Sequence, residues 1–458
     1  MKTKRLIVCL ALLALLSVLT PAAAENNGWY AGFGRKQILP DETGDQPLYI
    51  AGYNNGWEAA DILDDCEARA VWLDDGGEGI LLIGVDCIAL DSGTVRLIRE
   101  RLTDLPNCEA VHVYATHTHA GPDTLGLWGP VGVNGKNDAY MEALLQAAEE
   151  AGREAAADRR AGGLHHGKIQ TQNMYRDSRD PQVYDDMLYQ LRFVPEDGSA
   201  GIRLFFYGAH AESLRGDNRL LSRDYPGRLC DSVTQATGDR TMFFPGAIGG
   251  LIMTREFVVN VSRAAVENLE ITAKKLIDYA LEITPDQERV LPARLVMARE
   301  EFTVPLDNPA FLMYKFLGIL NNQAVPAQSA TGYGVKTELT VLKLGNLALT
   351  LIPGEIFPEL VYGGAFGDAN PQGVNPRPLC EIARENGMEE MLIVGLANDE
   401  VGYIVPPSDF LLNEKLPYLE KTMDYKAENH YEETNSVGPE CAHAIAEAFE
   451  KAVIRLAD

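Results

Sequence analysis

Short, nearly continuous hydrophobic runs alternate along the chain with longer stretches in which hydrophobic residues recur at helical spacing. Near-continuous runs are typical of strands covered on both faces, because both rows of side chains are then buried. Strands are therefore predicted at residues 79–85, 110–115, 202–207, 347–352 and 391–396. Helices are predicted at residues 139–160, 261–283 and 438–456. This alternation predicts an α/β fold in which helices are layered on a mixed β-sheet core.

The N-terminal segment has a different pattern, and residues 1–24 are predicted to be a secretory signal peptide. Basic residues precede an apolar run from Leu6 to Leu19, and alanines occupy positions 22–24. The run is shorter than the ~20 residues of a membrane span, although an uncleaved N-terminal anchor is the alternative. We therefore expect a secreted or periplasmic protein. Its mature chain, residues 25–458, is expected to form a single catalytic domain without stable membrane insertion.

The net charge limits the partners that the protein is expected to bind, and the cysteine spacing limits the kind of metal site. The chain carries 40 Lys and Arg against 66 Asp and Glu, a formal net charge of −26. Such an acidic protein is not expected to bind nucleic acid or anionic lipid headgroups, which require basic surfaces. A small molecule or a lipid is the expected substrate. The 7 cysteines include no Cys-x-x-Cys pair, which disfavours a thiolate zinc site. Their pairing and the oligomeric state do not follow from the sequence.

Polar clusters follow most of the predicted strands. His117 and His119 follow the second strand, His210 the third, Glu355 the fourth and Glu400 the fifth. Ligands bind beyond the carboxyl ends of strands in open α/β sheets, and residues two apart in a strand share a face. If each strand continues, these side chains face one cleft. Imidazole and carboxylate suit a catalytic zinc site; the alternative is a hydrogen-bonding histidine pair at a strand end.

Other motifs in the sequence give weaker support for a functional site. His165 and His166 stand among glycines and are expected in an exposed loop. No Gly-x-Ser-x-Gly elbow is present, which disfavours a serine hydrolase of the α/β type. The glycine-rich stretch Gly246–Gly250 lacks the lysine of a phosphate-binding loop, so we interpret it as a tight turn.

At these motifs the chain resembles the neutral/alkaline non-lysosomal ceramidase family, specifically its N-terminal catalytic domain. Thr116–Pro122 matches the family's THTHSGP signature with Ala120 in place of serine, and His210 falls at the family's second histidine. The resemblance covers essentially the whole mature chain. The other matching segments are Asp64–Ala70, Val85–Asp86, Asp224–Gly227, Pro353–Glu355, Asn398–Pro406 and Tyr431–Glu432.

Three departures from the family pattern stand out. Gly249 takes the place of a serine implicated in catalysis, and Glu400 that of a zinc-binding tyrosine in the family's Asn-x-Tyr-x-x-Tyr motif. The chain is also expected to lack the C-terminal immunoglobulin-like domain of ceramidases. The change at Gly249 and the missing domain bear on ceramide as the substrate and leave the metal site in place, whereas Glu400 would make that site more anionic than the family's.

The resemblance implies a zinc-dependent amidohydrolase acting on an N-acyl lipid, with Zn²⁺ activating the attacking water. The implied zinc ligands are His117, His210, Glu355 and Glu400. The resemblance further implies that His119 hydrogen-bonds the developing oxyanion or moves a proton, and that Tyr403 and Arg176 hold the substrate's polar head. Two alternatives stay open: a zinc hydrolase of another exported acyl amide or ester, and a non-catalytic metal-binding descendant of the fold.

Overall fold

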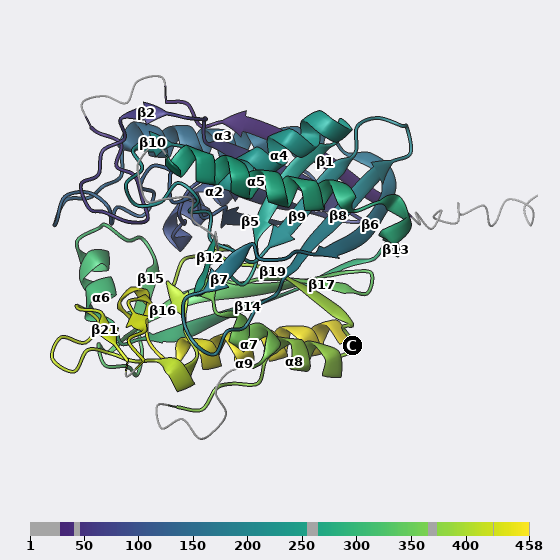
Figure 1. Cartoon of the computed structure of the whole chain (residues 1–458). Helices are drawn as coiled ribbons and strands as arrows, with labels where there is room; N and C mark the ends of the chain where they lie inside the picture. The colour runs from purple at the N-terminus through teal and green to yellow at the C-terminus, as the bar shows by residue number, and fades with distance from the viewer. Residues whose placement is uncertain (1–27, 41–45, 254–263, 365–372, 425, 458) are drawn as a thin grey trace, which may run out of the picture.

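Two β-sheets packed face to face form the middle of the molecule, and helices cover the outer face of each sheet (Figure 1). The computed structural model describes residues 28–40, 46–253, 264–364, 373–424 and 426–457. The predicted signal peptide at 1–24 therefore lies outside the described residues. Within those ranges, no helix has the length and apolar character needed to cross a membrane.

The larger sheet has nine strands in the order β11-β9-β8-β6-β1-β3-β4-β5, with β13 paired to β6. The pairs β4–β5 and β9–β11 are parallel, whereas β1–β3 and β6–β8 are antiparallel, so the predicted mixed sheet is confirmed. The strands are β1 (Trp29–Gln37), β3 (Glu67–Asp74), β4 (Gly79–Val85), β5 (Cys108–Ala115), β6 (Arg160–Gln170), β8 (Met187–Pro195), β9 (Ile202–Tyr207), β11 (Arg240–Pro245) and β13 (Arg289–Leu291).

The smaller sheet has five strands in the order β14-β16-β17-β19, with β15 paired to β16. Its β17–β19 pair is parallel. The strands are β14 (Leu295–Leu306), β15 (Gln323–Pro326), β16 (Tyr333–Leu344), β17 (Leu347–Leu351) and β19 (Glu390–Val394). Short strands pair elsewhere: β2 (Asp61–Ile62) with β10 (Leu220–Leu221), β7 (Tyr175–Asp177) with β12 (Leu251–Met253), β18 (Glu355–Ile356) with β20 (Tyr403–Ile404), and β21 (Thr422–Met423) with β22 (Asn429–His430).

The larger sheet is covered by α2 (Ser92–Arg101), α3 (Asp138–Ala157), α4 (Asp224–Thr237) and α5 (Ala264–Glu282). The smaller sheet is covered by α7 (Pro358–Tyr362), α8 (Leu379–Glu385) and α9 (Cys441–Ala457), and α6 (Pro309–Phe316) lies at one flank. Single-turn 3₁₀ helices are η1 (Pro285–Gln287), η2 (Pro407–Asp409) and η3 (Glu432–Asn435).

The four-layer arrangement explains the continuous hydrophobic runs. In β4, Leu81 and Ile83 pack under the helices, whereas Ile80 and Leu82 pack between the two sheets. Both faces of the strand are therefore buried. The predicted strands and helices are all present, with ends shifted by a few residues where the structure describes them, and residues 261–263 of the helix predicted at 261–283 lie outside the described residues. The six cysteines among the described residues are free thiols.

The loop predicted around His165 and His166 is wrong, because both residues lie in β6, an interior strand of the larger sheet. His166 is buried, and its Nε2 lies 3.0 Å from Glu390 Oε2. The neighbouring glycines allow close packing of strands rather than a turn. A Cβ at Gly162 would lie 2.3 Å from the carbonyl oxygen of Val194 on the facing strand.

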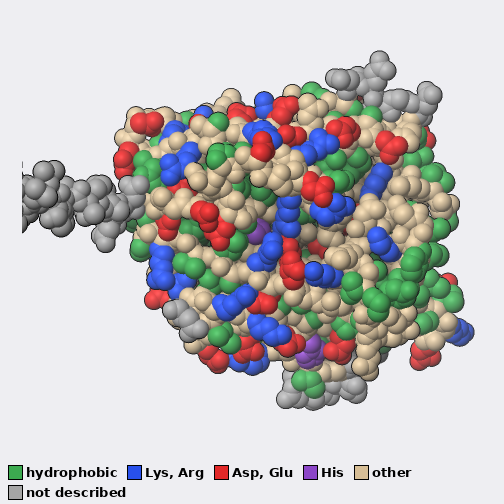
Figure 2. Space-filling view, turned by 180° about the vertical axis from the view of Figure 1, so that it is seen from behind, with side chains coloured by type: hydrophobic (Ala, Val, Ile, Leu, Met, Phe, Trp, Pro, Cys, Tyr) green, Lys and Arg blue, Asp and Glu red, His purple; other side chains and the backbone are tan. Residues whose placement is uncertain are grey.

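Acidic and basic side chains are interspersed on the face opposite to that of Figure 1 (Figure 2). The formal net charge of −26 is therefore not gathered into one patch on this face.

Candidate metal centre

The segments that follow β5, β9, β17 and β19 meet at one end of the two sheets. The backbone N–H of Asn398 donates to the carbonyl of Val113 at 2.7 Å, and that of His119 donates to Ala211 at 2.9 Å. The N–H of Ala115 donates to Leu396 at 3.3 Å. These backbone bonds join strand ends of the larger sheet to each other and to a strand end of the smaller one.

The chain turns sharply at the first histidine. β5 ends at Ala115, and His117 has a φ of +64°, a left-handed conformation that is uncommon for residues other than glycine. The expectation that the strand continues through His117 and His119, with both on its buried face, is therefore wrong. The left-handed turn, rather than strand alternation, brings the two rings together.

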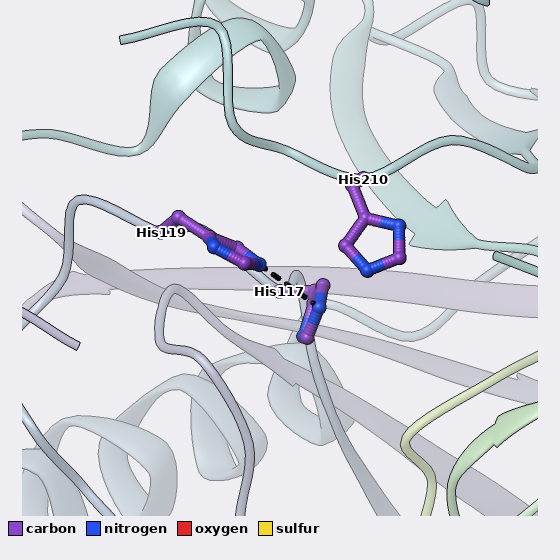
Figure 3. A group of neighbouring side chains, drawn as sticks. All are labelled: His117, His119 and His210. Carbon is purple, nitrogen blue, oxygen red and sulfur yellow. Dashed lines mark hydrogen bonds between the residues drawn. The ribbon is translucent and has the colours of Figure 1, made fainter. Parts of the chain in front are cut away.

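Three histidine side chains converge at this end of the sheets (Figure 3). One ring nitrogen from each of His117, His119 and His210 lies within 4.8 Å of the others, and the Nε2 atoms of His117 and His119 are 3.1 Å apart. His117 Nδ1 donates to the carbonyl of Ile88 at 2.7 Å, and His210 Nδ1 donates to Leu251 at 2.9 Å. Because each Nδ1 donates to a backbone carbonyl, each Nε2 points to the centre, and in the neutral ring this nitrogen carries the lone pair that binds a metal.

A carboxylate completes this group. Glu355 Oε2 lies 3.0 Å from His210 Nε2 and 3.3 Å from His117 Nε2. The Tyr403 hydroxyl, on the strand paired with that of Glu355, lies 3.3 Å from His210 Nε2. Burial lowers the pKa of His210, but the bond to Glu355 and its charge outweigh burial and raise it to about 9. Burial likewise raises the pKa of Glu355, but His117 and His210 outweigh it and hold that pKa below its ordinary value. Positive charge is thus favoured between these groups.

His119 and Glu400 have environments of their own. Burial, followed by the charges of His117 and His210, lowers the pKa of His119, which favours the neutral imidazole. Glu400 Oε1 accepts a bond from the N–H of Gly402 at 2.7 Å, while its buried Oε2 has no hydrogen-bond partner among the described residues. Burial and the nearby charge of Glu355 raise the pKa of Glu400. A divalent cation would offset the free-energy cost of burying the negative charge of Glu400. Imidazole nitrogens and carboxylate oxygens are also ligands of zinc in proteins, so this group of side chains fits zinc.

Two solved structures share this arrangement of elements, whereas no protein-family model and no curated protein matches the chain. A crystal structure of neutral ceramidase from Pseudomonas aeruginosa superposes with a TM-score of 0.72 over 94% of this chain and 75% of that chain, at 17% sequence identity. The chain has the neutral ceramidase fold. A second structure, of a ceramidase complexed with C2, gives a TM-score of 0.70 with the same coverage of both chains, at 16% identity. The resemblance expected from the motifs is confirmed for the fold.

Within the ceramidase fold, Arg176 and Arg179 have different surroundings. Arg176 lies on β7 and is exposed, whereas its neighbours Tyr175 and Asp177 are buried. Arg179 is buried, with its Nη1 donating to Glu433 Oε1 at 2.8 Å and its guanidinium carbon 5.0 Å from the centre of the Phe357 ring. Nothing in the sequence pattern of this segment distinguishes two arginines three residues apart, so Arg179 was not predicted as a site residue.

The turn at Gly249 packs against the segment that carries Glu355. The N–H of Gly249 donates to the carbonyl of Ile356 at 3.0 Å. A Cβ at this position would lie 2.4 Å from Phe357 Cδ2 and 2.9 Å from the carbonyl oxygen of Glu355. No side chain fits there without movement of the backbone beside Glu355, which supports the interpretation of this stretch as a tight turn.

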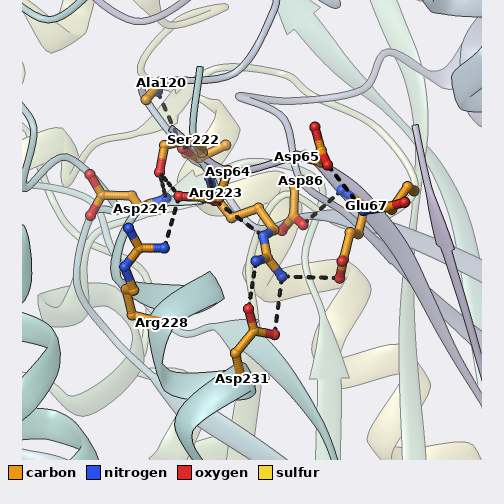
Figure 4. Close-up of polar contacts among 12 residues, drawn as sticks. Asp64, Asp65, Glu67, Asp86, Ala120, Ser222, Arg223, Asp224, Arg228 and Asp231 are labelled. Atoms are coloured by element: carbon orange, nitrogen blue, oxygen red, sulfur yellow. Dashed lines mark hydrogen bonds and ion pairs between the residues drawn. The ribbon is translucent and has the colours of Figure 1, made fainter. Parts of the chain in front are cut away.

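Buried Arg223 and Glu67 form an ionic cluster with the partly exposed Asp231 beside the histidine segment (Figure 4). Arg223 pairs with Asp231 at 2.6 Å and with Glu67 at 3.0 Å. Asp86, beside this cluster, accepts a bond from the Thr116 hydroxyl at 3.0 Å. The N–H of Ser222 donates to Ala120 at 2.9 Å. The residues on both sides of the histidines are therefore fixed by hydrogen bonds to this cluster and to the start of α4.

Proposed function

We propose that this protein is a zinc-dependent hydrolase that cleaves the amide bond of an N-acyl lipid of the ceramide type. One observation carries the proposal: the Nε2 atoms of His117 and His210 both approach Glu355 Oε2, at 3.3 and 3.0 Å, within a neutral ceramidase fold. We further propose that residues 1–24 are removed on export and that residues 25–458 form one catalytic domain.

The proposed zinc ligands are His117, His210, Glu355 and Glu400. When bound, the ion supplies Lewis acidity that makes water a nucleophile at neutral pH. The bonds from His117 Nδ1 to Ile88 and from His210 Nδ1 to Leu251 fix the imidazoles in their metal-binding orientation before the ion arrives.

His119 is proposed to act beside the ligands rather than as one of them. Because burial and its neighbours favour the neutral ring, it can accept a proton or hydrogen-bond the oxygen of the substrate carbonyl. Tyr403 and Arg176 are proposed to hold the polar head. Tyr403 is well placed for this, since its ring also contacts Phe357 and Tyr431, which form an aromatic wall beside the histidines.

The test combines elemental analysis of the purified mature protein with an assay of amine released from N-acyl lipids. The wild type is expected to hold about one zinc per chain and to turn over, and His117→Ala to lose metal and activity together. His443→Ala is the matched control, because His443 lies on α9 and bonds the carbonyl of Val374 at 2.8 Å. Full zinc and wild-type turnover in His117→Ala would disprove the site.

A further inference from the structure

Large hydrophobic side chains are exposed on three segments of the chain. We call these residues the apolar rim: Leu97 on α2, Val131 and Val133 in the loop before α3, and Met313, Phe316 and Leu317 in and directly after α6. Val131 is 93% exposed and Phe316 68%. Hydrophobic side chains gather at the right-hand edge of Figure 2, which is the side of α6 in Figure 1. Single exposed hydrophobic residues are ordinary, whereas a group of them marks a contact with a protein or a membrane.

Helix α6 has apolar side chains on two faces. Only one of its 8 residues is charged, and none of the 8 is buried. Phe311 and Tyr314 pack against the core of the larger sheet. Met313, Phe316 and Leu317 are spaced three and four residues apart, so they share the opposite face. A helix that is apolar on all sides is normally buried. This outer face therefore lacks a partner within the described part of the chain.

The three segments of the apolar rim are held side by side. The Lys136 ammonium donates to the carbonyl of Ile319 at 3.1 Å, which fixes the end of the loop that carries Val131 to the residues after α6. Leu97 of α2 and Lys315 of α6 line the same hollow in the surface. The apolar rim is therefore one surface rather than three separate exposures.

The apolar rim also adjoins the histidine centre. The N–H of Gly56 donates to the carbonyl of Trp128, three residues before Val131, at 2.8 Å. Tyr53, in the same segment as Gly56, meets the His119 ring edge-on at a centroid distance of 5.2 Å and is 38% exposed. These contacts place the apolar rim on the side of the centre where Tyr53 is exposed.

The composition of the apolar rim and the charge of the chain together indicate its partner. Phe and Leu side chains with a lysine nearby are typical of segments that lie in the interface of a lipid bilayer. The hydrocarbon chain of the proposed substrate holds that substrate in such a bilayer. The formal net charge of −26 opposes contact with anionic lipids, so the insertion of apolar side chains into an electrically neutral bilayer is favoured.

We propose that the apolar rim docks the protein on a bilayer of zwitterionic lipid, and that this contact brings the histidine centre to lipid substrates in the bilayer. The inference rests on the proposed function for the kind of substrate, and it adds the surface through which the protein reaches that substrate. Docking of this kind uses apolar side chains rather than charge, and it requires neither the metal nor hydrolysis.

The first measurement is co-sedimentation of the purified protein with phosphatidylcholine vesicles that contain no substrate. The wild type is expected to bind, and to stay bound when the salt concentration is raised. The double variant Met313→Gln with Phe316→Gln should partition into the vesicles ~10-fold less or weaker still, because both side chains leave water on docking. Val290→Gln is the matched control and should bind like the wild type. Val290 is 66% exposed and lies on β13, at the end of the molecule away from α6 (Figure 1).

The second measurement compares hydrolysis of a long-chain N-acyl lipid in the same vesicles with hydrolysis of a short-chain, water-soluble amide. The double variant should lose about 10-fold or more of the rate on the vesicle substrate and keep the rate on the soluble one. An equal loss on both substrates would overturn the inference in favour of a structural role for α6.

Other results would identify a different occupant of the apolar rim. Binding only to anionic vesicles, with release by salt, would overturn the inference in favour of electrostatic docking. A wild-type dimer that the double variant converts to a monomer, without vesicle binding, would make the apolar rim an interface between two copies of the chain. Vesicle binding without turnover of any amide would remove the proposed function and leave the docking surface, whereas turnover without vesicle binding would remove the docking surface alone.

Discussion

The space around Gly249 decides what kind of catalysis this turn can support. Gly249→Ser is expected to destabilise the protein by about 1–3 kcal/mol, because the added atoms meet the backbone of Phe357 and Glu355. It is also expected not to raise turnover, since the proposed reaction needs no nucleophile in this turn. Urea unfolding and kcat are the measurements. Gly77→Ser is the control, as Gly77 is exposed and its nearest atom is a flexible side chain at 3.4 Å. A faster enzyme with a covalent acyl intermediate would contradict this prediction.

Asp399 and Glu400 are adjacent carboxylates with different surroundings. Asp399 Oδ1 accepts bonds from Ser92 N–H at 2.7 Å and Asn322 Nδ2 at 2.6 Å, so it fastens the loop to α2 and to the segment after α6. We expect Glu400→Gln to weaken zinc binding ~10-fold or more, equivalent to ~1.4 kcal/mol per decade. We expect Asp399→Asn to lower the unfolding free energy more than the zinc affinity. Zinc titration and unfolding of both variants measure this, and the reverse result would identify Asp399 as the ligand.

At the scale of elements, the sequence predicts strands better than the turns that follow them. The hydrophobic run at residues 79–85 predicts β4, because a strand buried on both faces requires consecutive hydrophobic residues and these are visible in the sequence. The left-handed conformation of His117 is not marked in the hydrophobic pattern, because few non-glycine residues adopt a positive φ and nothing in the pattern identifies which ones do. The histidines were nevertheless predicted to share one cleft, because ligands bind beyond the carboxyl ends of strands in open α/β sheets. Arg179 was not predicted because its burial, and not its position in the sequence pattern, distinguishes it.

Hydrogen bonds between two elements lead to a prediction about the pH dependence of stability. Asn398 joins the segment after β19 to β5: its Oδ1 accepts the N–H of Val113 at 3.0 Å, and its Nδ2 lies 3.1 Å from His112 Nδ1. Burial lowers the pKa of His112 to about 3. Unfolded His112 takes up a proton near pH 6.5 while the folded form does not, so this stabilisation is complete above pH 6.5 and is lost as pH falls towards 3.

His112→Gln keeps an acceptor for Asn398 and removes the titration. Urea unfolding between pH 8 and pH 4 should therefore show a smaller loss of stability for the variant than for the wild type, by up to ~1.4 kcal/mol per pH unit below 6.5. The difference at pH 8 gives the cost of the substitution itself. Parallel pH profiles would show that His112 is not held neutral in the folded protein.

For the whole molecule, the important feature is that the proposed ligands come from both sheets. His117 and His210 follow strands of the nine-stranded sheet, and Glu355 and Glu400 follow strands of the five-stranded one. The sheets otherwise adhere through an apolar interface that includes Leu82 and Leu349. A bound ion would therefore link the two sheets at the end where the carboxylates otherwise repel each other.

Zinc is accordingly expected to stabilise the whole fold rather than the loops alone. Ligand binding to the folded state adds RT ln(1 + [L]/Kd), which is about 2.7 kcal/mol at a free concentration of 100 Kd. Thermal unfolding of chelator-treated protein in buffered zinc should show a single transition that moves upward with free zinc. The shift should be smaller in Glu400→Gln at the same free zinc, absent in His117→Ala and unchanged in His443→Ala. An equal shift in His117→Ala would place the stabilising zinc elsewhere, and a shift confined to one of two transitions would show that the ion does not join the sheets.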